Sequence, residues 1–172
     1  MSKSENQGRQ GKIEADMVRL LARNKKTLAL AESCTGGFIA HQITNVPGAS
    51  EIFLGGIVAY SNGVKEKFLG VRPETLKKHG AVSEAVAREM AEGARKKFGA
   101  DFAIAVTGIA GPSGGTKGKP VGTVFIAVAY DFETVVVKKL NCFGREQFKK
   151  VTANQALELL FHNSHKRDAH YS

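Results

Sequence analysis

The sequence predicts a single α/β domain in which a mixed sheet carries helices on both faces. Short apolar stretches that are typical of buried strands alternate with longer segments of helical periodicity. Helices join the early strands, which requires parallel crossovers, whereas segments 123–130 and 133–141 are separated by only two residues, as in an antiparallel hairpin. A chain of 172 residues is long enough for one domain with a sizeable core and short for two.

The first half of the chain predicts alternating helices and strands. Residues 1–11 are polar and predict a disordered lead, after which apolar residues recur at helical spacing. Pro47 and Gly48 end the second helix, and a glycine pair interrupts the second strand. The predicted elements are a helix over 12–24, a strand over 27–33, a helix over 38–46, a strand over 51–61, a helix over 62–71 and a short helix from Pro73.

The second half begins with a helix that extends to residue 98, capped at its start by Ser83. A buried strand over 100–108 leads into a Gly/Pro-rich loop, "GIAGPSGGTKGKPVG", which is too long for a simple connector and is therefore a functional candidate. The hairpin follows, and the last helix begins near Arg145. We expect the domain to span residues 12–163 and a polar tail to occupy 164–172.

Composition excludes several classes of protein. No apolar run approaches the ~20 residues of a membrane-spanning helix, and the polar start lacks the apolar core of a secretory signal, so we expect a cytoplasmic protein without a membrane partner. Cys34 and Cys142 are too few for a disulfide framework or a four-cysteine zinc site, and no metal is expected.

A net charge of +9 suits either a nucleic acid or an anionic small molecule. Aromatic residues make up only 8% of the chain, no base-stacking motif is present, and the lysines and arginines occur in short scattered pairs typical of solvated faces. We therefore predict no nucleic-acid partner. Nucleic-acid binding would show itself by an affinity that falls steeply with salt.

The turn "ESCTGG" joins a predicted strand to a predicted helix, where Ser33 is a candidate nucleophile. Its hydroxyl could point off the sheet edge while backbone N–H groups at the start of the helix face an anion or an oxyanion. The alternative is that Ser33 or Thr35 merely caps the helix. The turn is not the G-x-S-x-G elbow of the α/β-hydrolases, because Glu32 precedes the serine.

A nucleophilic serine requires a base, and none of the five histidines is well placed to serve, since they lie in a helix, before a turn glycine or towards the polar carboxyl-terminal end. Lysine can replace histidine when burial lowers its pKa. The segment "AYSNGVK" places Tyr60 and Lys65 where a strand ends and a helix begins, at the sheet edge expected for Ser33. The alternative readings are a surface lysine and a half-buried strand tyrosine.

The Gly-rich segment from Thr107 to Gly115 ends a neighbouring strand and is the expected second wall of one pocket. Its successive N–H groups could form an anion-binding nest, to which Lys117 and Lys119 would add charge. The segment matches neither the P-loop nor G-x-G-x-x-G, so a flexible surface loop is the alternative.

Four segments in order, "AESCTGG", "AYSNGVKEKFLGV", the stretch from "HGAVSEAV" through "TGIAGPSGGTKGKPVGTVFIAVA", and "GREQ", resemble the CinA carboxy-terminal domain family of nicotinamide mononucleotide amidohydrolases, in a stand-alone form. The resemblance covers residues 13–162. It implies a three-layer α/β/α fold with a mixed, mostly parallel five-stranded sheet, no cofactor, and a homodimer. It also implies hydrolysis of the carboxamide of nicotinamide mononucleotide.

Carried onto this sequence, the resemblance implies Ser33 as the nucleophile, Lys65 as the base and Tyr60 as an aid to proton transfer. The substrate-binding residues that it implies are Cys34, Thr35, Gly36, Thr107, Gly108, Ala110, Gly111 and Arg145. An alternative function is that of a non-catalytic domain that binds a nucleotide or a phosphorylated ligand, which would keep the glycine loops without needing the serine or the lysine.

Overall fold

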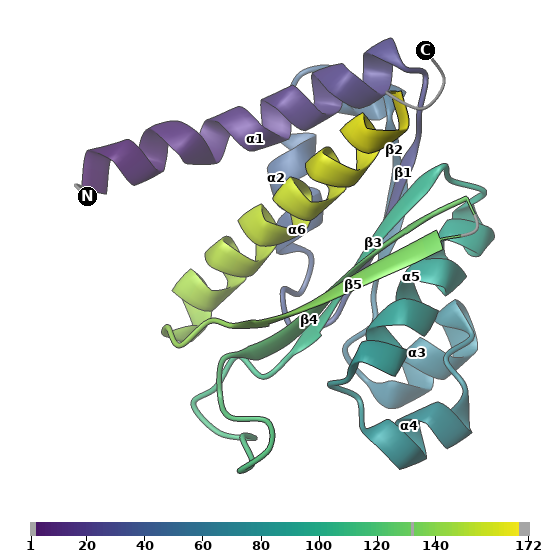
Figure 1. Cartoon of the computed structure of the whole chain (residues 1–172), viewed down its shortest axis with the longest axis vertical. Helices are drawn as coiled ribbons and strands as arrows, with labels where there is room; N and C mark the ends of the chain where they lie inside the picture. Colours follow the sequence, from purple (N-terminus) through teal and green to yellow (C-terminus); the bar gives the residue numbers. More distant parts are fainter. Residues whose placement is uncertain (1–2, 132, 169–172) are drawn as a thin grey trace.

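One five-stranded sheet lies between two layers of helices in the computed structural model, which describes residues 3–131 and 133–168 (Figure 1). The strands are β1 (Leu28–Glu32), β2 (Phe53–Val58), β3 (Phe102–Gly108), β4 (Thr123–Tyr130) and β5 (Glu133–Leu140). They are ordered β2-β1-β3-β4-β5. β1 is parallel to β2 and β3, and β4 is antiparallel to β3 and β5, so β4 alone runs against the other four. The predicted three-layer, mixed and mostly parallel sheet is confirmed.

The two helical layers are formed by different parts of the chain (Figure 1). One face of the sheet is covered by α1 (Lys3–Arg23), α2 (Phe38–Thr44) and α6 (Arg145–Asp168), and the other by α3 (Asn62–Leu69), α4 (Pro73–His79) and α5 (Glu84–Phe98). A 3-10 turn, Ala49–Glu51, precedes β2. Among the described residues, no helix is both long and apolar enough to cross a bilayer.

Side-chain size differs between the two faces of the sheet. The central strand β1 directs Leu28 and Leu30 into the core beneath α1, α2 and α6, and Ala29 and Ala31 into the core beneath α5. Alternation along a strand separates the two sets, and β3 and β4 follow the same pattern. The alanines leave room for α5 close to the sheet, and burial of each leucine contributes about 1.5–3 kcal/mol. The alternation therefore fixes which face of the sheet each strand residue occupies.

Two sequence predictions, the disordered lead and the interrupted second strand, differ from the structure. α1 already includes residues 3–11, which the sequence predicted to be disordered. α6 continues to Asp168, so helix extends into the segment predicted as a polar tail, whose polarity is unchanged by this. β2 is not broken by its glycine pair, because a bulge opposite the Leu28/Ala29 step absorbs the irregularity and Gly55 supplies a φ of 142°. Residues 1–2 and 169–172 lie outside the described residues.

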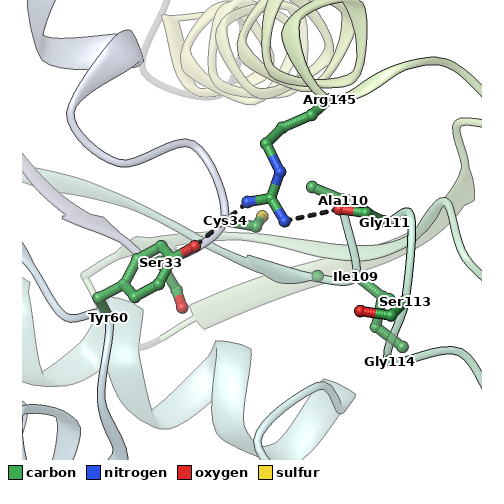
Figure 2. Close-up of a pocket in the computed structure, with 10 residues that line it drawn as sticks. Ser33, Cys34, Tyr60, Ile109, Ala110, Gly111, Ser113, Gly114 and Arg145 are labelled. Atoms are coloured by element: carbon green, nitrogen blue, oxygen red, sulfur yellow. Dashed lines mark hydrogen bonds between the residues drawn. The ribbon is translucent and has the colours of Figure 1, made fainter.

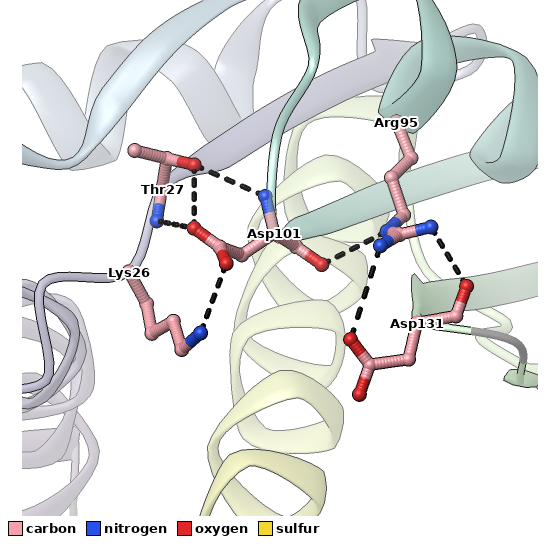
Figure 3. Close-up of polar contacts among 5 residues, drawn as sticks. All are labelled: Lys26, Thr27, Arg95, Asp101 and Asp131. Atoms are coloured by element: carbon pink, nitrogen blue, oxygen red, sulfur yellow. Dashed lines mark hydrogen bonds and ion pairs between the residues drawn. The ribbon is translucent and has the colours of Figure 1, made fainter.

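A polar network fastens the amino-terminal ends of β1 and β3, away from the site described below (Figure 3). The Asp101 carboxylate accepts hydrogen bonds from Thr27 N at 2.9 Å and Thr27 Oγ1 at 2.9 Å, and pairs with Lys26 Nζ at 3.0 Å. Burial alone would raise the pKa of Asp101, but these contacts outweigh it and lower the pKa. Arg95 joins the Asp101 carbonyl to the β4–β5 turn at Asp131.

We predict that Asp101→Ala lowers the free energy of unfolding by about 1–2 kcal/mol at pH 7, a value reduced by partial solvent exposure. Because the folded-state pKa is depressed, the contribution is complete above the unfolded value of about 3.9 and is lost as pH falls through the folded value. Urea unfolding of the parent and of Asp101→Ala at pH 7 and pH 3 measures this contribution to the free energy of unfolding. Asp16→Ala, which breaks only an exposed pair with Arg19, is the control and should change stability by less than about 0.5 kcal/mol. A parent–variant difference that stays constant at low pH would contradict the assignment.

Candidate active site

A cavity of about 280 Å³ opens at the carboxyl ends of β1 and β3, where ligands bind in open α/β sheets (Figure 2). Its wall is formed by the turn after β1, the residue that follows β2 by two positions, the loop after β3 and the first residue of α6. The lining residues are Ser33, Cys34, Tyr60, Gly108, Ile109, Ala110, Gly111, Ser113, Gly114 and Arg145. Its size lies near the lower end of the ~300–1,000 Å³ typical of small-molecule sites.

Ser33 is the first residue after β1 and is held by the main chain. Its N–H donates to the Val106 carbonyl of β3 at 3.0 Å, and its own carbonyl accepts from Gly36 N at 3.2 Å. The side chain is only 9% exposed and reaches the cavity. α2 begins after Gly37, which has no side-chain cap, so neither Ser33 nor Thr35 caps this helix. The capping alternative is therefore wrong, and the Ser33 hydroxyl is available for another partner.

The start of α2 is capped instead by the buried carboxylate of Glu32, a role that the sequence analysis missed. Its oxygens accept from Gly37 N at 3.0 Å, Ile39 N at 3.1 Å and Ala40 N at 2.8 Å. The Glu32 carbonyl also accepts from Ala59 N at 2.8 Å, which ties the end of β1 to the end of β2. The sequence carries one signal for this role, an acidic residue a few positions before the start of a helix, where a carboxylate is favoured. Glu32 thus fixes the backbone on both sides of the nucleophile candidate.

Lys65 lies in α3 with its side chain only 2% exposed, so the predicted surface lysine is ruled out. Ser61 caps the helix by accepting from Val64 N at 3.3 Å, and this first turn aims the Lys65 side chain inward. Its Nζ lies 3.1 Å from Ser33 Oγ and 2.7 Å from the Ala59 carbonyl oxygen. No carboxylate pairs with it among the described residues, and burial lowers its pKa below the ordinary lysine value. A neutral Lys65 can therefore accept the Ser33 proton.

Cys34 lies beside Ser33 but is unsuited to act as the nucleophile. Burial, with a smaller contribution from the Glu32 carboxylate, raises the pKa of its thiol to about 12. It is therefore a neutral thiol near pH 7, and the thiolate that would raise the pKa of Lys65 is absent. In the same turn, the Gly36 and Gly37 N–H groups already have partners, and of the two remaining N–H groups only that of Cys34 belongs to a residue that lines the cavity.

Tyr60 and Arg145 close the other side of the cavity (Figure 2). Arg145 donates from Nη1 to Tyr60 Oη at 3.3 Å and from Nη2 to the Gly111 carbonyl at 2.6 Å. Tyr60 is 64% exposed, and no hydrogen bond joins it to Ser33 or Lys65 within the described part of the chain. The predicted half-buried strand tyrosine is wrong, since the residue follows β2 and projects into solvent.

The remaining predicted residues divide into two groups. Gly108, Ala110 and Gly111 line the cavity, whereas Thr35, Gly36 and Thr107 do not. Thr35 is fully buried. Thr107 is also buried, and its hydroxyl donates to the Ala81 carbonyl at 2.8 Å, a contact that fixes the segment before α5. Three cavity residues of the Gly-rich loop were not singled out from the sequence, namely Ile109, Ser113 and Gly114.

The Gly-rich loop is exposed over residues 112–118 but is closely packed at Gly111. A Cβ placed at Gly111, where φ is 75°, would lie 2.5 Å from Val121 Cγ1, so a side chain at this position would clash. Lys119 donates to the His79 carbonyl at 2.7 Å and so ties the loop to α4. Neither Lys117 nor Lys119 lines the cavity, and the predicted charge of this wall comes from Arg145 instead. In the described ranges, no three histidine, cysteine or carboxylate side chains gather as a metal site.

The fold and the site define an α/β/α domain with a buried serine–lysine pair at a small cavity over the sheet edge. The chain belongs to the CinA family, because the model of the CinA C-terminal domain matches residues 10–164. This confirms the family resemblance of the sequence segments.

Relatives agree with this assignment. CinA-like proteins of Thermotoga neapolitana and Thermotoga maritima are 61% and 54% identical over 150 and 149 residues, each match covering 87% of this chain and 36% of the relative. The chain thus spans about a third of the length of these curated relatives. Among solved structures, the competence/damage inducible protein CihA of Agrobacterium tumefaciens has a TM-score of 0.86 at 37% identity over 89% of this chain and 94% of that one. A CinA superfamily protein of Klebsiella pneumoniae has a TM-score of 0.88 at 32% sequence identity, and the match covers 91% of this chain and 98% of that one.

We predict that Glu32→Gln lowers the free energy of unfolding by about 1–3 kcal/mol. Three N–H groups now donate to the two carboxylate oxygens of Glu32, whereas the amide of glutamine has only one acceptor oxygen. Urea unfolding measures the change. Glu51→Gln is the matched control, since Glu51 is exposed in the 3-10 turn before β2. Equal stability of Glu32→Gln and the parent would show that the cap does not hold the turn.

Proposed function

We propose that this chain hydrolyses the carboxamide of nicotinamide mononucleotide to nicotinate mononucleotide and ammonia. The observation that carries the proposal is the 3.1 Å contact between Ser33 Oγ and the buried Nζ of Lys65 at the cavity wall. The choice of amide follows from the resemblance of the "ESCTGG", "YSNGVK" and "TGIAGP" segments to amidohydrolases of the CinA family. That resemblance also leads us to propose a homodimer.

In the first half of the proposed reaction, Ser33 Oγ attacks the carboxamide carbon while its proton passes to neutral Lys65 Nζ. The Ala59 carbonyl, 2.7 Å from Nζ, holds the amine in place and favours its protonated form as the proton arrives. The N–H group of Cys34, which lines the cavity, is the proposed donor to the oxyanion. Lys65 then returns its proton to the departing nitrogen, the C–N bond breaks, and ammonia leaves an acyl ester on Ser33.

The second half repeats these roles with water. Lys65, neutral again, accepts a proton from a water molecule that attacks the ester carbonyl. The C–O bond to Ser33 breaks, the proton passes from Lys65 to Ser33 Oγ, and the carboxylate product is released. The atoms balance as amide plus water giving carboxylic acid plus ammonia, without an oxidant or a metal.

Tyr60 and Arg145 are proposed to position the substrate from the open side. Their contact places a hydroxyl and a guanidinium side by side at the cavity wall, where Tyr60 can also pass a proton once a ligand orders it. Arg145 is held by the Gly111 carbonyl, so the charge is oriented before a substrate arrives. Pre-orientation reduces the entropy lost on binding.

The decisive test is ammonia release from nicotinamide mononucleotide by the purified chain and its variants. We predict that Ser33→Ala lowers turnover at least ~10³-fold and Lys65→Met ~10²–10⁴-fold, because one removes the nucleophile and the other the base. Lys67→Met, an exposed lysine of the same helix, is the control and should retain parental turnover. Lys65→Met should unfold at no lower temperature than the parent at pH 7, because it replaces a buried amine by an apolar chain of similar length.

Tight binding of the nucleotide without turnover in the parent would replace this proposal by the non-catalytic binding domain. Parental turnover in Ser33→Ala would exclude the serine as the nucleophile.

The pH dependence of kcat/KM provides a second prediction. Because only deprotonated Lys65 accepts the serine proton, log kcat/KM should rise with pH at a slope near 1 and level off below the ordinary lysine pKa of about 10.4. Rates measured from pH 7 upwards avoid the second ionisation of the substrate phosphate, near 6. A profile that is still rising at the ordinary lysine pKa, or that falls as the pH rises from 7, would contradict the role of Lys65.

A further inference from the structure

Lys149 lies in the second turn of α6 and reaches over the turn that carries Ser33. A Cβ built at Gly36 would lie 3.6 Å from Lys149 Nζ, so the cation sits against the exposed, side-chain-free corner of that turn. It is also close enough to Cys34 for its charge to act on the thiol. Its side chain is half-buried.

Lys149 differs from the adjacent Lys150 in having no partner among the described residues. Lys150, the next residue, pairs with Glu146 at 2.6 Å, and Lys119 donates to the His79 carbonyl. Within the described ranges no ion pair or hydrogen bond holds Lys149. The acid of the neighbouring turn, Glu32, already accepts three N–H bonds from α2. A half-buried ammonium without an acid is partly desolvated and uncompensated, which an anionic ligand would correct.

Arg145 and Lys149 are four residues apart in α6 and therefore project from the same helical face. Arg145 lines the cavity, and Lys149 stands one turn further along, beside the Ser33 turn. Gly36 has no side chain to fill the space between its backbone and the lysine. Two cations and an open corner thus flank one side of the candidate site.

We propose that Lys149, together with Arg145, binds the phosphate of a phosphomonoester substrate. This inference rests on the proposed function and extends it, because it gives the substrate its orientation: the phosphate lies on the α6 side and the amide at Ser33. The same anion subsite would serve a phosphorylated ligand if the chain only bound one. In this proposal, the positive charges of Arg145 and Lys149 in α6 attract the phosphate.

The first test is direct binding of ribose 5-phosphate, measured by calorimetry, which does not depend on turnover. Lys149→Met keeps the apolar stem and removes the charge, and it should weaken binding about 10- to 100-fold. Lys150→Met makes the same change one residue away, where the lysine already has an acid partner, and should bind within about twofold of the parent. Lys149→Arg should restore most of the affinity. Equal affinity of Lys149→Met and the parent, or no binding by the parent, would overturn the subsite.

Kinetics then separate this inference from the amidase proposal. With nicotinamide mononucleotide, Lys149→Met should raise KM about tenfold or more and leave kcat within about threefold. With nicotinamide riboside, which lacks the phosphate, kcat/KM should be the same in the variant and the parent. An equal loss on both substrates would overturn the phosphate role. Absence of turnover in the parent, with ribose 5-phosphate still bound through Lys149, would refute the amidase and keep the subsite.

Discussion

The burial of the Lys65 amine is the constraint on which the rest of the site depends. An ammonium enclosed among apolar groups without a carboxylate is costly, and the protein offers it only the Ala59 carbonyl and the Ser33 hydroxyl. Both acceptors belong to strand ends that β1 and β2 bring together, so the lysine can be accommodated only if those strands end in register. The same enclosure lowers the pKa of Lys65 and makes the amine a base.

Glu32 supplies the matching constraint on the serine. A carboxylate that binds three N–H groups of the next helix cannot shift without losing all three, and Ser33 is its immediate neighbour in the chain. The two adjacent residues therefore have different roles: the Glu32 carboxylate caps the start of α2, and Ser33 lines the cavity. The small alanines of β1 pack against α5 and its leucines pack on the other face of the sheet. This packing fixes the position of β1 between the two helical layers, and with it the position of the turn that follows β1.

Local patterns predicted the order of elements and the sheet edge that bears the site, because alternation and glycine-rich turns are written in neighbouring residues. Contacts between distant residues were less accessible. The burial of Lys65 could not be predicted, because it depends on how distant segments pack. The same holds for the hydrogen bonds that Lys119 donates to the His79 carbonyl and Thr107 donates to the Ala81 carbonyl. The helical state of residues 3–11 was not predicted, because the segment has no apolar residues whose spacing could indicate a helix.

The two lysines around the Ser33 turn show how burial alone can assign different chemistry to one residue type. Lys65 is enclosed, meets only neutral oxygens, and is driven towards the neutral amine that a base requires. Lys149 is only half-buried and lies beside the exposed corner at Gly36, where its side chain can reach a phosphate. An acid near either one would remove the distinction, because it would hold Lys65 protonated and neutralise Lys149. The engagement of Glu32 with the N–H groups of α2 is what keeps the one carboxylate of this turn from doing so.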